Sequence, residues 1–279
     1  LTVLLNFIIR TAFIRTLSIS YLGLNGLFTN ILTVLSFAEL GFGTAIVYAM
    51  YSPIAKNDYR KITAYMNSFA RVYSVVGLSI LLIGLMLVPN LEFFISDTAE
   101  IPAGAPPLWL IYILFLLNSA ASYFFNYKRS LVVATQNGYL DSRNQLSFNL
   151  LKSVLQLLVL LVWKSYLGYL VIQIFCSLLA NIALSVKVDK LFPYLQTYSA
   201  ERLSKEEKQE LKKNVIAMTF HKLGSVVVSG VDNILISKYV GIFAMGCYSN
   251  YTLISSTIKT LFVQIMSPIT ASVGNFVAE

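Results

Sequence analysis

The chain has 279 residues, of which 57% are apolar and only 12% are charged, and its mean hydropathy is +0.70. This composition excludes an ordinary soluble domain and indicates an integral membrane protein. The net charge of +8 does not indicate nucleic-acid binding, because the basic residues lie in short loops between apolar runs, where they act as membrane topology signals.

Apolar runs of about 17–25 residues, the length that crosses a bilayer as a helix, follow one another along the chain. We place them at residues 1–20, 27–50, 66–88, 108–127, 146–163, 167–187, 215–238 and 247–267. The runs lack the alternation of strands and are too long for barrel strands. The fold expected is therefore an all-α, polytopic transmembrane helical bundle.

One sizeable polar segment, residues 189–214, interrupts these runs. Within it, Ser204 is followed three residues later by Glu207, which predicts a capping box at the start of a short charged helix. We therefore expect a first lobe of six transmembrane helices at 1–188, a cytoplasmic charged linker at 189–214, and the first two helices of a second lobe at 215–279. Because the chain begins and ends close to apolar runs, we expect it to be part of a longer, transporter-sized protein.

The distribution of basic residues predicts the orientation, since lysine and arginine accumulate on the cytoplasmic side. Alternate loops carry only Lys164 and the boundary residue Lys238. The other loops carry thirteen basic residues: Lys56, Arg60, Lys61, Lys128, Arg129, Arg143, Lys187, Lys190, Arg202, Lys205, Lys208, Lys212 and Lys213. The N-terminus and residues 189–214 are thus predicted to face the cytoplasm from the cytoplasmic membrane.

A weak internal repeat lies on either side of the charged linker. Tyr21-Leu22-Gly23 followed by Gly26-Leu27-Phe28-Thr29-Asn30 resembles Tyr239-Val240-Gly241 followed by Gly246-Cys247-Tyr248-Ser249-Asn250. We expect each copy in the outer turn between the first two helices of a lobe. Six spans separate the copies, so they point the same way and predict a central cavity with alternating access. A chance similarity between glycine-rich turns is the alternative.

Five cations fall inside the apolar runs, where only two acids, Glu39 and Asp232, could neutralise them. The cations are Arg10, Arg15, Lys152, Lys222 and Lys259. A cation at mid-membrane costs about 2.5–3.5 kcal/mol on insertion scales, so such residues normally face a wet cavity, a partner or an anionic ligand. The surplus of positive charge predicts an anionic ligand.

Depth in the membrane separates these residues. Arg10 lies about 15 Å below the outer end of its helix and Glu39 about 18 Å, so the two could form a structural salt bridge. Arg15, at about 8 Å, could instead extend to the outer interface. Lys259, at about 18 Å, is too far from either boundary to reach it easily, which favours a position in the cavity.

Lys152 and Lys222 lie nearer the inner boundary and could extend to cytoplasmic water or face the cavity. Asp232 is either a partner for Lys259 or an arginine, or a site for a coupling cation. The candidate substrate-binding residues are therefore Arg10, Arg15, Lys222 and Lys259, with Glu39 and Asp232 as charge partners or coupling-ion ligands.

Four stretches of the N-terminal region carry a family resemblance. They are Arg10 with Phe13-Ile14-Arg15, Tyr21-Leu22-Gly23-Leu24-Asn25-Gly26-Leu27-Phe28, Ala38-Glu39-Leu40-Gly41-Phe42-Gly43-Thr44-Ala45-Ile46, and the inner loop Tyr51-Ser52-Pro53-Ile54-Ala55-Lys56-Asn57-Asp58. This region resembles the opening of bacterial polysaccharide and oligosaccharide flippases of the multidrug/oligosaccharidyl-lipid/polysaccharide exporter superfamily. The likeness is most specific over residues 6–62.

The resemblance implies a transporter of twelve to fourteen helices that moves an undecaprenyl-pyrophosphate-linked oligosaccharide from the inner to the outer leaflet, for surface polysaccharide synthesis. Related lipid II flippases place arginines of the first helix in a cationic central cavity, and Arg10 and Arg15 match that pattern. The implied partners are the lipid-linked oligosaccharide, the bilayer and a coupling Na⁺ or H⁺. No cofactor, metal or nucleic acid is expected.

Polar and aromatic residues inside the lobe would have to provide contacts to sugars. The candidates are Tyr48, Asn67, Tyr123, Asn126, Gln145 and Asn149. The alternative function is a cation-coupled multidrug antiporter of the same superfamily, which should have acids rather than bases in its cavity. An enzyme is not expected, because the outer acids Glu92, Asp97 and Glu100 are irregularly spaced with no histidine nearby.

Overall fold

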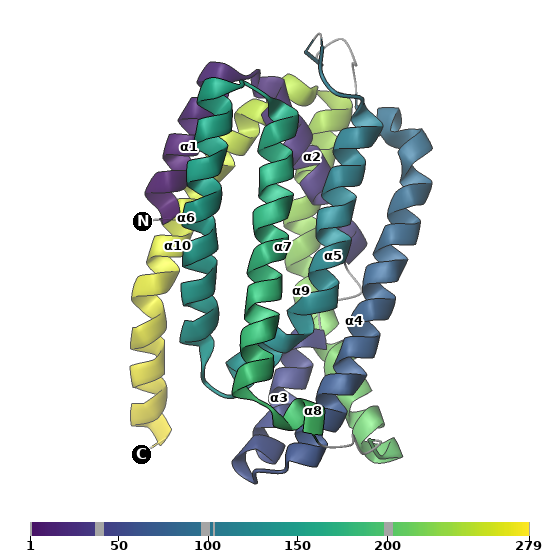
Figure 1. Cartoon of the computed structure of the whole chain (residues 1–279), viewed down its shortest axis with the longest axis vertical. Coiled ribbons are helices and arrows are strands. Elements are labelled where there is room, and N and C mark those ends of the chain that lie inside the picture. The colour runs from purple at the N-terminus through teal and green to yellow at the C-terminus, as the bar shows by residue number, and fades with distance from the viewer. Residues whose placement is uncertain (1, 37–41, 96–100, 103, 198–202, 279) are drawn as a thin grey trace.

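The computed structural model covers residues 1–279 and describes all of them except 1, 37–41, 96–100, 103, 198–202 and 279; the side chains of 2–4, 44, 126, 221–231, 261 and 263–278 also lie outside the description. Every described element is a helix. These are α1 (Thr2–Thr16), α2 (Ile19–Leu35), α3 (Phe42–Ala55), α4 (Tyr59–Leu87), the 3₁₀-helix η2 (Val88–Phe94), α5 (Leu108–Ala134), α6 (Gly138–Val162), α7 (Tyr166–Leu191), α8 (Tyr194–Thr197), α9 (Lys205–Tyr239) and α10 (Ile242–Ala278). The long helices run roughly parallel to one axis (Figure 1). The expected all-α bundle is confirmed.

Four of the predicted spans are helices long and apolar enough to cross a membrane. They are Tyr59–Phe94, Leu108–Phe125, Gly138–Val162 and Tyr166–Leu191. Large apolar side chains point outward from them, with Met86 73% exposed and Leu161 62% exposed. Outward-facing apolar surface on helices of this length indicates helices that meet lipid.

The N-terminal helices have different boundaries from those predicted. The first run, 1–20, contains the end of α1 at Thr16 and the start of α2 at Ile19. Ser18 causes the early start of α2, since its hydroxyl accepts a hydrogen bond from the Ser20 N–H at 3.3 Å. The predicted run 27–50 is divided between α2 and α3.

The charged linker and the predicted seventh span are not separate elements. Helix α9 begins at Lys205 and continues for 35 residues to Tyr239, so residues 205–214 and 215–238 share one helix. The predicted capping box is confirmed: the Glu207 N–H donates to Ser204 Oγ at 3.1 Å, and the Ser204 N–H donates to Glu207 Oε2 at 2.9 Å. Glu207 also pairs with Lys61 of α4 at 2.6 Å, and this hydrogen bond lowers the pKa of the Glu207 carboxyl.

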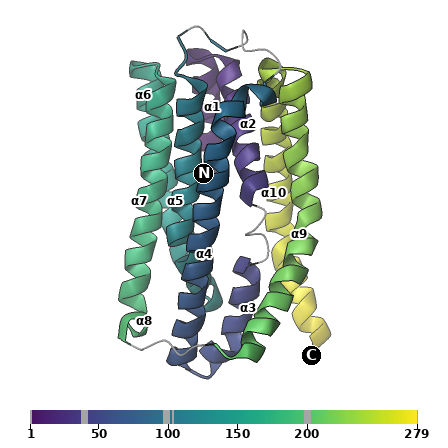
Figure 2. The ribbon, with the colours of Figure 1, turned by 90° about the vertical axis from the view of Figure 1, so that its right-hand side faces the viewer.

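Figure 2 shows α6 and α7 on one side of the bundle and α9 and α10 on the other, with α2, α4 and α5 between them. The packed core between α2 and α5 is apolar. Phe28 of α2 is fully buried against Tyr112 of α5, with ring centroids 5.4 Å apart. Helix α1 packs against α6, and α2 packs against α5, α9 and α10.

Helices α2 and α10 make a reciprocal contact near their first residues. A Cβ added to Gly23 would lie 2.1 Å from the carbonyl oxygen of Ile242, and one added to Gly246 would lie 2.4 Å from that of Ile19. Each helix begins at its isoleucine and has its glycine four residues later. The two helices start at the same end of the bundle and run in the same direction (Figure 1). Each glycine thus lets one backbone approach the other closely.

This contact relates a different pair of glycines from the alignment of the internal repeat, which itself stays a prediction. The sequence alignment pairs Gly26 with Gly246, whereas the packing pairs Gly23 with Gly246. In the second copy, Tyr239 ends α9 and residues 240–241 form the turn to α10, where Gly241 has a φ of 133° that favours glycine. Residues 21–23 lie inside α2 instead, so the prediction of a turn for the first copy is wrong. Gly23 allows close packing of α2 against α10. The neighbouring residues in the sequence do not distinguish a glycine with this role from a glycine in a turn.

Candidate functional site

Two adjoining cavities lie within the bundle. The first, which we call the cation cavity, has a volume of about 200 Å³ and lies between α1, α2, α6, α7 and α10, with Arg10, Asn25, Lys152, Gln156, Tyr169 and Gln173 among its lining residues. The second, which we call the amide cavity, has a volume of about 330 Å³ and lies between α5, α6 and α7, with Asn118, Gln145, Phe148, Asn149, Lys152, Gln173 and Asn181 among its lining residues. Lys152 and Gln173 line both cavities, so the two adjoin at these residues.

Arg10 reaches the cation cavity from α1. Its neighbours Ile9 and Phe13 are buried, and the Phe13 ring packs edge-on against Tyr166 and Tyr169 of α7. These contacts fix the face of α1 that turns inward. The guanidinium then crosses to α10, where Nε donates to Asn250 Oδ1 at 2.6 Å and Nη2 donates to Ser249 Oγ.

The partners of Arg10 are neutral. No carboxylate lines the cation cavity among the residues that the structure describes. The predicted partner Glu39 lies outside the described residues, so the Arg10–Glu39 pair stays a prediction. The positive charge of Arg10 is therefore stabilised by amide and hydroxyl dipoles rather than by a described acid.

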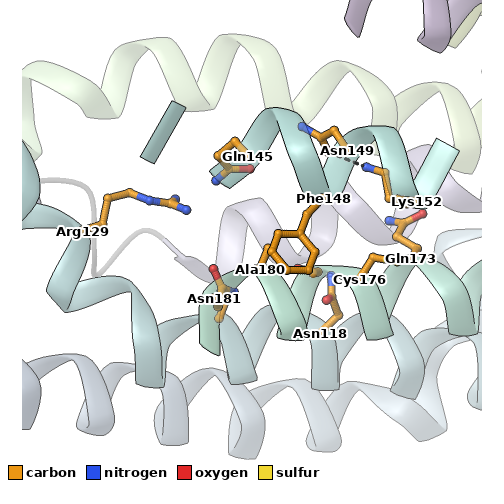
Figure 3. A pocket seen from close by; sticks show the side chains of 12 residues that line it. Asn118, Arg129, Gln145, Phe148, Asn149, Lys152, Gln173, Cys176, Ala180 and Asn181 are labelled. Atoms are coloured by element: carbon orange, nitrogen blue, oxygen red, sulfur yellow. Dashed lines mark hydrogen bonds between the residues drawn. The ribbon is translucent and has the colours of Figure 1, made fainter. Parts of the chain in front are cut away.

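Lys152 lies nearer the middle of its helix than the predicted span 146–163 places it. Helix α6 begins at Gly138, eight residues before the predicted start, so Lys152 lies about 21 Å from the first residue and about 15 Å from the last. Its half-buried ammonium donates to Asn149 Oδ1 at 3.1 Å (Figure 3). Lys152 lines both cavities, as one of its two predicted alternatives has it, and its depth in the bilayer stays a prediction.

The far end of the amide cavity has a compensated charge. Arg129 of α5 lies there, and its Nε is 3.1 Å from Asp141 Oδ2 of α6. Because this ion pair neutralises the guanidinium, the net positive charge of the two cavities comes from Arg10 and Lys152.

Carboxamides dominate the wall between these two ends. Figure 3 shows Gln145 and Asn149 on one side of the amide cavity, Asn118 and Asn181 on the other, and the Phe148 ring between them. The Asn118 Oδ1 atom is buried and has no hydrogen-bond partner among the described residues. Asn144 does not line the cavity; its side chain donates to the Ala180 carbonyl at 2.9 Å and holds α6 against α7.

The lining residues follow a helical period that is visible in the sequence. On α6 they are Gln145, Asn149, Lys152 and Gln156, and on α7 they are Gln173, Ser177 and Asn181. Steps of three, four and seven residues place each set on one helix face. Of these residues, the sequence reasoning selected Gln145, Asn149 and Lys152. It missed the others because each was considered alone rather than as part of a polar stripe.

Several predicted site residues do not line these cavities. Arg15, Asp232 and Lys259 are exposed on the surface of the bundle, and the side chain of Lys222 lies outside the described residues. Their roles in substrate or ion binding stay predictions. A further exposed cation, Arg71, lies within α4 and was not counted among those in apolar runs.

The other proposed sugar-contacting residues are dispersed. Tyr48 lines a separate cleft between α3, α4 and α9, Asn67 is exposed, and Tyr123 is buried in the core. The side chain of Asn126 lies outside the described residues.

Comparison with protein-family models, curated proteins and solved structures finds no match to this chain. The structure itself shows an all-α bundle, and four of its helices are long and apolar enough to cross a membrane. Its interior contains a polar region in which two cations have neutral hydrogen-bond partners.

Proposed function

We propose that this chain belongs to a transporter that moves an undecaprenyl-pyrophosphate-linked oligosaccharide across the cytoplasmic membrane by alternating access. One observation carries the proposal: Arg10 and Lys152 line the same cavity inside an apolar bundle, and the side chains that they contact are neutral. Cations in such an environment are costly unless they serve a ligand, a pathway or a partner. A diphosphate would supply the compensating charge.

The chemistry of the two cations suits a diphosphate. A guanidinium has five N–H donors, and the bonds to Ser249 and Asn250 use two of them. Guanidinium groups bind phosphate oxygens through paired, charge-assisted hydrogen bonds, whereas an ammonium acts as a compact point charge. One of each at a shared cavity would hold the charged head group of a lipid while its prenyl chain stays in the bilayer.

The contacts of Arg10 also support alternating access. Arg10 belongs to the first predicted lobe, and its partners Ser249 and Asn250 belong to the second. A phosphate bound at Arg10 would compete with these partners for the guanidinium. Substrate binding would thereby loosen a contact between the lobes, which is the coupling that a transport cycle requires.

The cavity lining favours an anionic substrate over the cationic drugs of the alternative antiporter. A carrier of organic cations needs acids at its site, and the described lining of both cavities contains amides and bases. A coupling site for Na⁺ or H⁺ at Glu39 or Asp232 is compatible with a flippase. The proposal therefore includes the coupling ion as a partner.

The proposal is tested by transport in liposomes. Purified protein would be reconstituted with a labelled undecaprenyl-pyrophosphate-linked oligosaccharide, and movement between leaflets measured by accessibility to an external glycosidase. We expect Lys152→Gln to slow transport by about 10- to 100-fold, the value of one or two charge-assisted hydrogen bonds. Lys164→Gln, at the exposed α6–α7 turn, is the matched control and should transport normally.

Two results would contradict the proposal. One is wild-type transport by both lysine variants at equal protein levels. The other is exchange of cationic dyes for Na⁺ or H⁺ by the purified protein with no movement of the lipid-linked oligosaccharide.

A further inference from the structure

The amide cavity differs chemically from the cation cavity that it adjoins. Its described lining supplies carboxamides from three helices, an aromatic ring and one arginine that is already paired with Asp141. We propose that it is the binding site for the neutral, hydroxyl-rich part of the transported molecule, namely the first sugar units of the lipid-linked oligosaccharide. This inference rests on the proposed function and assigns the residues that would select the sugar.

Carboxamides match hydroxyl groups in hydrogen bonding. Each amide offers two N–H donors and a carbonyl acceptor, and each sugar hydroxyl both donates and accepts. Asn118 belongs to this wall, and its buried Oδ1 has no hydrogen-bond partner among the described residues. An anion would find an uncompensated charge here only at Lys152, where the amide cavity adjoins the cation cavity, because the Arg129 charge is compensated by Asp141.

The Phe148 ring gives the cavity an apolar element. It projects from α6 between the amides of α6 and those of α5 and α7 (Figure 3). A sugar ring has hydroxyl groups around its edge and C–H groups on its faces. Amides around an aromatic ring therefore fit a sugar better than they fit a uniformly apolar or a charged ligand.

The shared residue Lys152 fixes the order of the two subsites. A diphosphate held by Arg10 and Lys152 would place the attached sugar next to Asn149, and further units toward Gln145 and Arg129. On α6 the distance from Lys152 to Gln145 is seven residues, or about 10 Å. The sugars would thus extend toward the basic end of the bundle, which the sequence predicts to be cytoplasmic.

A comparison of two lipid probes tests this arrangement. The probes are undecaprenyl pyrophosphate without sugar and the same lipid with an oligosaccharide, and their binding to the protein in nanodiscs would be measured by native mass spectrometry. We expect wild-type protein to bind the glycosylated probe more tightly. Gln145→Ala and Asn181→Ala should each weaken that binding by about three- to tenfold, the value of one or two neutral hydrogen bonds, and leave the bare lipid unaffected.

Two controls give the result its meaning. Gln209→Ala removes an exposed carboxamide from α9 and should change neither affinity. Arg10→Gln should weaken both probes, because both carry the diphosphate. Retained binding of bare lipid also shows that the Gln145 and Asn181 variants are folded.

The outcomes separate this inference from the proposed function. If the bare and glycosylated lipids bind the wild type equally, or if the amide variants weaken both probes alike, the diphosphate site stands and the sugar site is refuted. If neither probe binds the wild type, the proposed function fails and the sugar site fails with it.

Photocrosslinking supplies a second measurement that does not depend on removing an amide. With p-benzoylphenylalanine in place of Phe148, we expect crosslinks to the sugar part of the glycosylated probe and none to the bare lipid. The same group at Leu158, exposed on α6, is the control and should not capture sugar. Sugar crosslinks at position 158 but not at 148 would overturn the inference.

Discussion

The two ends of the bundle are held together in different ways. At one end, α2 and α10 meet through Gly23 and Gly246, each against a backbone carbonyl of the other helix. At the other end, ion pairs join the helices: Lys61 to Glu207, Lys128 to Asp189 and Arg129 to Asp141. Backbone contact requires close packing and tolerates no added atom, whereas ion pairs near water separate and re-form at little cost.

The polar cavities lie between these ends, and the contrast suggests how they are reached. At the glycine end, the contact between α2 and α10 leaves no room for an added methyl group at Gly23 or Gly246. At the basic end, the ion pairs named above for the described residues are formed by partly exposed side chains. In the proposed transporter, a substrate would therefore reach Arg10 and Lys152 from the basic end, and movement of the glycine contact would open the other end.

The largest effect is expected where the backbone contact is broken. Gly23→Ala would place a methyl group 2.1 Å from the Ile242 carbonyl oxygen, so α2 and α10 would have to separate. We expect the free energy of unfolding to fall by about 1–3 kcal/mol or more, as in overpacked interiors, with a lower midpoint of thermal unfolding.

Gly26→Ala is the matched control for that change. Its added methyl group would meet only the flexible tip of Met245, which can move away. A Gly23→Ala protein as stable as Gly26→Ala would show that the α2–α10 contact is looser than the structure indicates.

A smaller effect on stability but a strong one on transport is expected for Arg10→Gln. The matched variant is Arg15→Gln, on the same helix but exposed. Loss of the Arg10 charge should reduce transport of the lipid-linked oligosaccharide by about 10- to 100-fold, the value of one or two charge-assisted hydrogen bonds. Transport by the two variants would be compared at equal protein levels in liposomes.

Arg15 decides between two interpretations of α1. The resemblance to flippases implies that both arginines serve the substrate, whereas the structure brings only Arg10 to the described cavities. Normal transport by Arg15→Gln would restrict the site to Arg10 on this helix. A defect of similar size in both would show that Arg15 reaches the substrate in another state of the cycle.

These residues show what one sequence can and cannot predict. The capping box at Ser204 was predictable because it depends on residues three positions apart. Helical periodicity places Gln145, Asn149, Lys152 and Gln156 on one face of a helix. The sequence predicts this polar stripe only when the four residues are considered together. By contrast, the hydrogen bond from Arg10 to Asn250 joins residues 240 positions apart, and no local pattern predicts such a contact.

Element boundaries limited the prediction in a second way. Hydropathy placed the start of the fifth span at residue 146, because residues 138–145 are polar, yet they continue the same helix. The predicted start places Lys152 near one end of its span and leaves an interfacial role open beside the cavity, whereas in the structure Lys152 lies near the middle of α6 and lines both cavities. Gly23 was misassigned for a related reason, since its role depends on a helix more than 200 residues away.

A third test concerns the ion pairs at the basic end. Lys128 donates to both oxygens of Asp189, at 2.7 and 2.6 Å, and joins α5 to α7. Lys128→Met keeps most of the apolar length but leaves Asp189 without this partner. We expect a loss of about 1 kcal/mol in the free energy of unfolding, because partial exposure lets water replace part of the interaction.

Lys187→Met is the control, since it removes a nearby lysine of α7 that forms none of these three pairs. Both variants would be compared by chemical denaturation in detergent. Equal stability of the Lys128 and Lys187 variants would show that the basic end does not depend on the Lys128–Asp189 pair.

The smallest effect is expected from the pair between Lys61 and Glu207, and it should depend on pH. The hydrogen bond from Lys61 lowers the pKa of the Glu207 carboxyl below its ordinary value of 4.5. A lowered pKa in the folded state means that the carboxylate contributes stability above about pH 4.5. That contribution is lost as the pH falls through the lower pKa. Because both side chains are partly exposed, it should be only a few tenths of a kcal/mol.

Hydrogen–deuterium exchange at residues 205–214 is the measurement that resolves so small a change, since local opening of one helix end requires less free energy than global unfolding. In the wild type, protection of this segment relative to α6 should decrease between pH 6 and pH 3.5 after correction for the intrinsic exchange rate. Glu207→Gln should have lower protection at pH 6 and little further change, whereas Glu210→Gln, an exposed glutamate on the same helix, should behave like the wild type. The same pH dependence in Glu207→Gln would mean that other groups hold the start of α9 against α4. Of the ion pairs named above, only Lys128–Asp189 and Arg129–Asp141 would then distinguish the basic end from the glycine end.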